Sequence, residues 1–77
     1  MTTHHDYRGY VFQITYQPRE SIYLLNFVDI SDIITSGSTL FQAFANACEA
    51  LDLHLETAQK LGLGMPLQRH RLVLNPA

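Results

Sequence analysis

The segment 35–51 constrains the fold of this chain more than any other part of its sequence. Gly37 provides the flexible backbone with which a strand can leave a sheet. Thr39 is placed to cap the N-terminus of a helix, and Gln42 follows three residues later, as in a capping box. The segment therefore predicts the end of a strand, a turn and the start of a capped helix.

The predicted helix runs from about Leu40 to Leu61. Apolar residues recur there at spacings of three or four, which places them on one face of a helix. Gly62 suits the position after the last turn, and Gly64 and Pro66 prevent the helix from resuming. The predicted apolar face comprises Leu40, Phe44, Ala47, Leu51, Leu55 and Ala58, widened by Phe41, Ala43 and Cys48.

Three strands are predicted before this helix. Residues 8–17 alternate between apolar and polar side chains, which is typical of a half-buried strand. Pro18 favours a turn, and residues 21–28 then form a run that is apolar on both faces. After a polar bend at 29–32, a brief third strand is expected around residues 33–36.

The residues at the two ends complete the predicted domain. Residues 1–6 are polar and are expected to fray, whereas residues 69–74 are expected to form a last short strand. The prediction is a single α+β domain over residues 1–77, with a small antiparallel sheet, one long packed helix and the order β-β-β-α-β. No separate DNA-binding domain is expected.

The composition favours association over nucleic-acid binding. Charged residues make up 16% of the chain, against about 25% in typical soluble domains. Only five residues are Lys or Arg and the net charge is −2, so the basic stripe of a nucleic-acid-binding protein is missing. A surface this poor in charge indicates a covered patch, and a homodimer or homotetramer is expected.

The same sequence favours a cytoplasmic location. The single cysteine cannot form an intrachain disulfide, which fits a reducing compartment. The polar N-terminus does not resemble a signal peptide, and no apolar run is long enough to cross a bilayer. Neither a membrane nor a cofactor is therefore expected among its partners.

The predicted association surface lies on the sheet. One helix can cover only one face of a small sheet, so the outer side chains of the second strand are left for another chain. The last strand would add an open edge that invites pairing. The expected interface residues are Ile22, Leu24, Val28, Leu72 and Leu74.

Candidate metal sites are few in this sequence. His4 and His5 are adjacent, but no third ligand follows at a suitable spacing. Asp29 and Asp32 form the one close carboxylate pair outside the helix, and such a pair can hold Mg²⁺ only with further acidic ligands. No metal site is predicted.

No catalytic site is predicted either. His54 has no acidic or nucleophilic neighbour one helical turn away, so it is expected to be a partly exposed helical residue. Cys48 lies on the inner face of the helix, without a base or a helix N-terminus to lower its pKa. The chain is therefore not expected to be an enzyme.

Several motifs follow one another in a distinctive order. They are Asn26-Phe-Val-Asp29, Thr35-Ser-Gly-Ser-Thr-Leu40, Ala43-Phe-Ala-Asn-Ala-Cys-Glu-Ala-Leu51 and Gly62-Leu-Gly-Met-Pro66. In this order and spacing the chain resembles the HicB-like antitoxin family over about residues 7–66. Two features depart from that family: the bend at 27–32 lacks its prolines and glycine, and the family's C-terminal DNA-binding element is not expected within residues 1–77.

The resemblance implies a degraded ribonuclease H-like fold and a protein-binding function. Members of the family bind and neutralise a HicA-type toxin, which is a small nuclease that cleaves messenger RNA. One alternative is a stand-alone HicB-like domain that forms homo-oligomers for another purpose. A third is a residual metal-dependent nuclease that uses Asp29 and Asp32.

Overall fold

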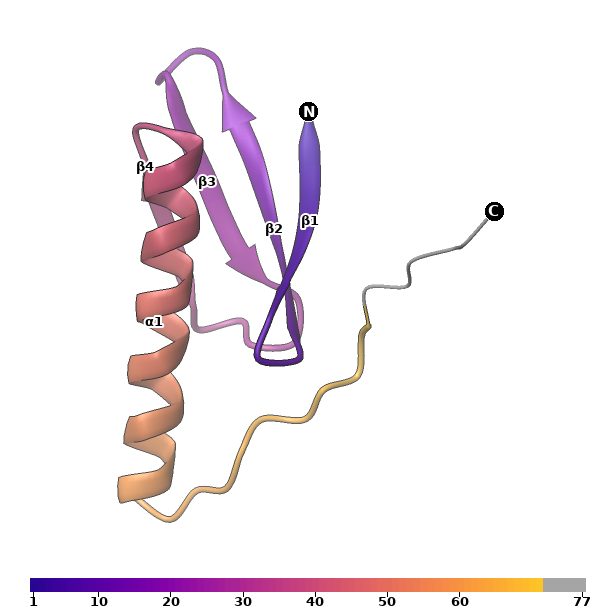
Figure 1. Ribbon diagram of the computed structural model, residues 1–77, viewed down its shortest axis with the longest axis vertical. Coiled ribbons are helices and arrows are strands. Elements are labelled where there is room, and N and C mark those ends of the chain that lie inside the picture. The colour runs from indigo at the N-terminus through magenta and orange to yellow at the C-terminus, as the bar shows by residue number, and fades with distance from the viewer. Residues whose placement is uncertain (72–77) are drawn as a thin grey trace.

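Four strands precede one helix in the computed structural model, which describes residues 1–71 (Figure 1). The strands are antiparallel and lie side by side in the order of the sequence. The α+β class, the antiparallel sheet and the single long helix are thus confirmed within these residues. The elements are β1 (Thr2–Tyr7), β2 (Tyr10–Gln17), β3 (Ile22–Phe27), β4 (Ile34–Gly37) and α1 (Leu40–Lys60).

Strand β1 corrects the expectation that the N-terminus frays. A two-residue turn, Arg8-Gly9, joins it to β2 with φ values of +54° and +85°. Positive φ at both turn positions is the geometry that matches the twist of a tight hairpin, and the flanking Tyr7 and Tyr10 are paired. The described order is therefore β-β-β-β-α. The predicted last strand is not formed by residues 69–71, and Leu72–Leu74 lie outside the described residues.

The core lies between the helix and one face of the sheet, which we call the inner face. The central strands supply large side chains that are almost fully buried, and the helix supplies mainly small ones. Small helical residues allow the helix to approach the sheet closely. The core includes Phe12, Ile14, Leu25 and Phe27 from the sheet and Ala43, Ala47, Leu51 and Leu55 from α1.

The start of the helix packs directly on the end of β4. A Cβ atom added to Gly37 would lie 2.4 Å from the backbone nitrogen of Ala43 and 2.8 Å from its Cα. The backbone of Gly37 does not adopt a positive φ, so glycine is required here for close approach rather than for flexibility. The sequence predicted that Gly37 provides backbone flexibility, and the structure shows instead that it allows close packing against Ala43.

The predicted helix cap is present. Thr39 Oγ1 accepts a hydrogen bond of 3.0 Å from the Gln42 backbone N–H. The Gln42 carboxamide oxygen in turn accepts from the backbone N–H of Ser38 at 2.7 Å, one residue before the cap. The two bonds together fix the point at which the chain enters α1.

The predicted apolar face of the helix is only partly buried. Ala47, Leu51, Leu55 and Ala58 are in the core as expected. Phe44 remains 37% exposed, although its ring packs against that of Phe12 at 5.3 Å. Leu40 and Phe41, which were also expected to pack, are exposed, and Phe41 is 84% exposed. The first turns of α1 lie near the corner of a small sheet, so they have little sheet surface to cover.

Candidate protein-binding surface

One flank of α1 lies against the outermost strand, β4, and the two elements share a hydrogen bond. Asn46 Nδ2 donates to the backbone oxygen of Ser36 at 2.8 Å. Two shallow hollows of about 340 and 360 Å³ follow this seam. We call their lining the β4–α1 surface: Asp32, Ile33, Ile34, Thr35, Asn46, Glu49, Ala50, Leu53, His54 and Thr57.

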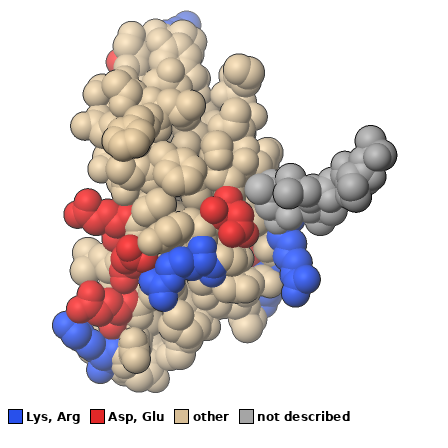
Figure 2. Space-filling model, viewed as in Figure 1, with Lys and Arg blue, Asp and Glu red and all other residues tan. Residues whose placement is uncertain are grey.

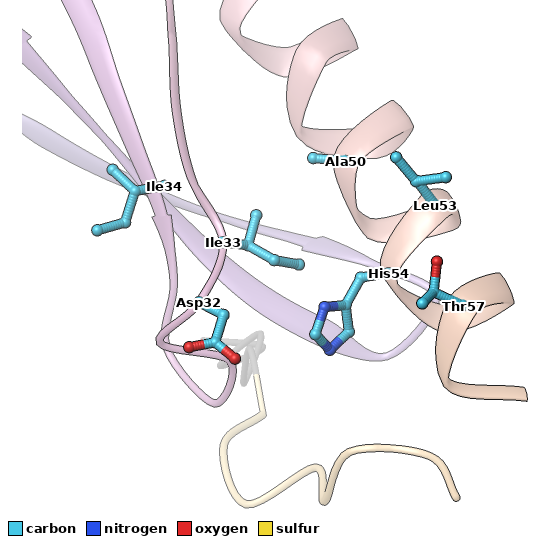
Figure 3. A pocket seen from close by; sticks show the side chains of 7 residues that line it. All are labelled: Asp32, Ile33, Ile34, Ala50, Leu53, His54 and Thr57. Atoms are coloured by element: carbon cyan, nitrogen blue, oxygen red, sulfur yellow. The ribbon is translucent and has the colours of Figure 1, made fainter. Parts of the chain in front are cut away.

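Apolar side chains stand out on both sides of the 340 Å³ hollow (Figure 3). Ile34 comes from β4 and is 70% exposed, and Leu53 comes from α1 and is 63% exposed. Ile34 also borders a third hollow of about 230 Å³ on the outer face of the sheet. Exposed apolar groups at the rims of adjacent hollows are typical of a surface that packs against another protein.

The charged residues of this surface are acidic. Asp32 and Glu49 line the hollows, and no lysine or arginine of residues 1–71 does so. Two basic side chains near the helix are already paired, Arg8 with Asp52 at 2.9 Å and Lys60 with Glu56 at 3.1 Å. The surface therefore combines an apolar centre with uncompensated negative charge.

His54 and Asp32 approach this hollow from opposite sides. The imidazole extends from α1 into the hollow, and the Asp32 carboxylate lies across from it in the loop before β4 (Figure 3). His54 is half-buried, as the sequence predicted. The sequence could not indicate Asp32 as its neighbour, because the two residues meet only when the helix packs on β4.

Asp29, the other member of the acidic pair, has a separate structural role. Its side chain is only 5% exposed and accepts hydrogen bonds from the backbone N–H groups of Arg69 and His70 at 2.7 and 2.9 Å. His70 Nδ1 lies 2.6 Å from the other carboxylate oxygen. Burial alone would raise the pKa of Asp29, but these hydrogen bonds outweigh burial and hold that pKa below its usual value.

The Asp29 contacts, which we call the clasp, fasten the chain that follows the helix. That chain passes beneath the sheet toward the β1 side (Figure 1). On the way, the Pro66 carbonyl accepts a 2.6 Å hydrogen bond from the Tyr10 hydroxyl. Within residues 1–71, no group of three or more His, Cys, Asp or Glu side chains is arranged to hold a metal ion.

Three of the predicted interface residues, Ile22, Leu24 and Val28, lie along the outer face of β3 and just beyond its end. Leu24 is 37% exposed on the outer face of the sheet, where it lines the third hollow with Ile34. Ile22 and Val28 are half-buried, and Val28 borders the chain segment held by the clasp. Leu72 and Leu74 lie outside the described residues.

The remaining candidate side chains take structural positions. The His5 ring stacks on Phe12 at 5.3 Å, and His4 Nε2 lies 3.1 Å from the Gln13 amide nitrogen on the other face. Cys48 is half-buried, and burial, with a smaller contribution from Asp52, raises the pKa of its thiol.

Asp52 also ties the first hairpin to the helix. It accepts a 3.0 Å hydrogen bond from the Tyr7 hydroxyl, which raises the pKa of Tyr7, and it pairs with Arg8. Neither partner of Asp52 is near it in the sequence. The two ends of this contact are 45 residues apart in the chain, so no local pattern announces it.

Comparison of the chain with protein-family models, curated proteins and solved structures found no match. In the part of the chain that the structure describes, no helix has the length and apolar character needed to cross a membrane.

Proposed function

We propose that this chain is a HicB-like antitoxin domain that binds and neutralises a HicA-type toxin. The observation that carries the proposal is the β4–α1 surface, where exposed Ile34 and Leu53 are accompanied by the carboxylates of Asp32 and Glu49. The order of motifs over residues 7–66 supports the same function. The domain acts by binding and not by catalysis.

A nuclease that binds RNA must present basic residues near its active site, because the phosphate backbone is negatively charged. An acidic surface attracts such a protein and competes with RNA for the same residues. Leu53 and Ile34 supply the apolar area that stabilises the complex after encounter. Asp32 and Glu49 supply the charge that selects a basic partner.

The test is co-expression with a HicA-type toxin, followed by co-purification and a growth assay. Leu53→Glu removes apolar area from the surface, and Leu53→Lys removes the same area and adds a charge that repels a basic partner. Both variants should bind less tightly than the unaltered chain, and the lysine variant should be the weaker by about tenfold or more.

Leu61→Lys is the matched control, because Leu61 is exposed on the same helix end but does not line the hollows. It should bind and rescue growth like the unaltered chain. Equal binding by both Leu53 variants and the control would refute this surface as the binding site. Failure of the unaltered chain to bind any HicA-type toxin would refute the function.

The second candidate is a stand-alone homo-oligomer with another role, which the low charge of the chain favours. The third, a nuclease using Asp29 and Asp32, predicts RNA cleavage with Mg²⁺ or Mn²⁺ that is lost in Asp29→Asn. We expect no such cleavage, because the Asp29 carboxylate is engaged by Arg69 and His70. No direct binding to DNA is expected.

A further inference from the structure

Strand β1 leaves one complete side of its backbone without a partner among residues 1–71. The Tyr16 N–H donates to the Met1 carbonyl, so Met1 directs its backbone groups toward β2. In an antiparallel ladder this orientation alternates. Thr3, His5 and Tyr7 therefore also face β2, and the N–H and C=O groups of Thr2, His4 and Asp6 point away from the sheet.

This open edge lacks the features that normally prevent strands from pairing. It is six residues long and contains no proline and no lysine, and Asp6 is its one charged side chain. Natural proteins usually protect such an edge by shortening it, charging it or covering it. The opposite edge, β4, is short, and the outward carbonyl of Ser36 is taken by Asn46.

An uncharged apolar surface adjoins the open edge. A hollow of about 290 Å³ on the inner face is lined by Met1, Thr3, Ile14, Tyr16, Tyr23 and Leu40. Phe44 lies beside it, with its ring 5.4 Å from that of His5 on β1. In the upper part of Figure 2, charged side chains are seen only near the top of the molecule, and the surface just below them is uncharged.

We propose that two copies of this chain pair antiparallel through β1 and form one continuous sheet with both helices on the same side. The edge is self-complementary, because Thr2, His4 and Asp6 of one copy meet the same outward groups of the other. One symmetric register sets His4 of each copy opposite Asp6 of the other, an attractive pair on the outer face. The same register sets the two His5 residues opposite each other, so the Phe44 ring beside each His5 borders the new seam.

The proposed pairing is independent of toxin binding. The β4–α1 surface lies at the other end of the sheet, so each copy of the dimer keeps it accessible. The proposed β1 pairing places self-association at the edge of the sheet, whereas the sequence predicted it at the outer-face residues Ile22, Leu24 and Val28. The symmetric two-fold arrangement closes after two copies and does not propagate into a filament.

The test compares His4→Pro with His4→Ala. Proline removes the outward N–H of His4, which the hairpin does not use, and proline is tolerated at the edge of a sheet. Alanine removes the imidazole but keeps the backbone donor. By light scattering at tens of micromolar, the unaltered chain and His4→Ala should have twice the monomer mass of 8.8 kDa. His4→Pro should be monomeric, with its dissociation constant raised more than about tenfold.

Amide exchange of the unaltered chain provides a second measurement that does not depend on folding of the proline variant. The amides of Thr2, His4 and Asp6 should gain protection as the protein concentration rises. A monomeric unaltered chain would overturn the proposal, as would a dimer that persists in a folded His4→Pro variant. Protection of these three amides in dilute, monomeric protein would also overturn it, because the edge would then be covered within one chain.

Discussion

The two edges of the sheet are built in opposite ways. β4 is four residues long and lies under the flank of α1, where Asn46 binds the carbonyl of Ser36. β1 is six residues long, and no strand of residues 1–71 lies beyond it. The contrast shows that one helix can protect only one edge of a small sheet. The edge that the helix covers has its backbone groups occupied within the domain, and the other edge can pair with a second chain.

The largest effect is expected where the covered edge meets the helix. In Gly37→Ala the added Cβ would collide with backbone atoms of Ala43, which cannot move without shifting the whole helix. We expect the free energy of unfolding to fall by about 3 kcal/mol, the upper end for overpacking. Urea denaturation followed by circular dichroism measures this change.

Ser36→Ala is the control for this substitution. Ser36 is the exposed neighbour of Gly37, and its side chain points to the outer face of the sheet. Its replacement should change stability by less than about 0.5 kcal/mol. Similar stabilities for the two variants would mean that the helix does not depend on close packing at β4.

A smaller effect is expected from Asn46→Ala, which removes the donor that occupies the Ser36 carbonyl. The loss of one exposed hydrogen bond should lower the free energy of unfolding by about 0.5–1.5 kcal/mol. The substitution also leaves β4 with a free outward acceptor, so the covered edge comes to resemble β1. Thermal unfolding and light scattering measure the two consequences.

Asn26→Ala is the matched control, since Asn26 is an exposed asparagine on the outer face of β3. It should leave both stability and mass unchanged. If Asn46→Ala were as stable as this control, the Asn46 contact would contribute nothing to the protection of the β4 edge.

The smallest effect is local and depends on pH. The pKa of Asp29 is lowered in the folded chain, so the stabilisation by the clasp is fully present above the usual value of 3.8 and is lost as pH falls through the lower folded pKa. The backbone amide resonances of Arg69 and His70 should shift as the clasp opens in this acid range.

Asp29→Asn should abolish that titration step, because the carboxamide that replaces the carboxylate does not ionise. Asp32→Asn should retain it, since Asp32 is exposed and does not contact these amides. An amide shift that persists in Asp29→Asn would assign the pH response to another group.

Local patterns predicted much of the fold. The hairpin of β2 and β3 follows from alternation and a proline turn, and the observed strands agree with it to within two residues. The helix was predicted at 40–61 and is observed at Leu40–Lys60. Gly62 ends it as expected: its N–H donates to the Gln59 carbonyl, and the Leu63 N–H donates to the Ala58 carbonyl.

The candidate site was much less predictable. Leu53 is an apolar residue outside the predicted apolar face of the helix. It was the one feature of the sequence that could have indicated the candidate site. Ile34 was assigned only to a short strand. Their convergence with Asp32 and Glu49 depends on how α1 crosses β4, which no spacing in the sequence specifies.

The sequence by itself determined where the helix begins and ends and which runs form strands, because caps, turns and side-chain periodicity act over a few neighbouring residues. Tertiary structure decided the rest. The polar segment at 2–7 became a strand because β2 supplied a partner for its backbone, and Gly37 became essential because Ala43 packs against it. Asp29 took its role from His70, 41 residues away. These properties arise from contacts between segments that meet only when the chain has folded.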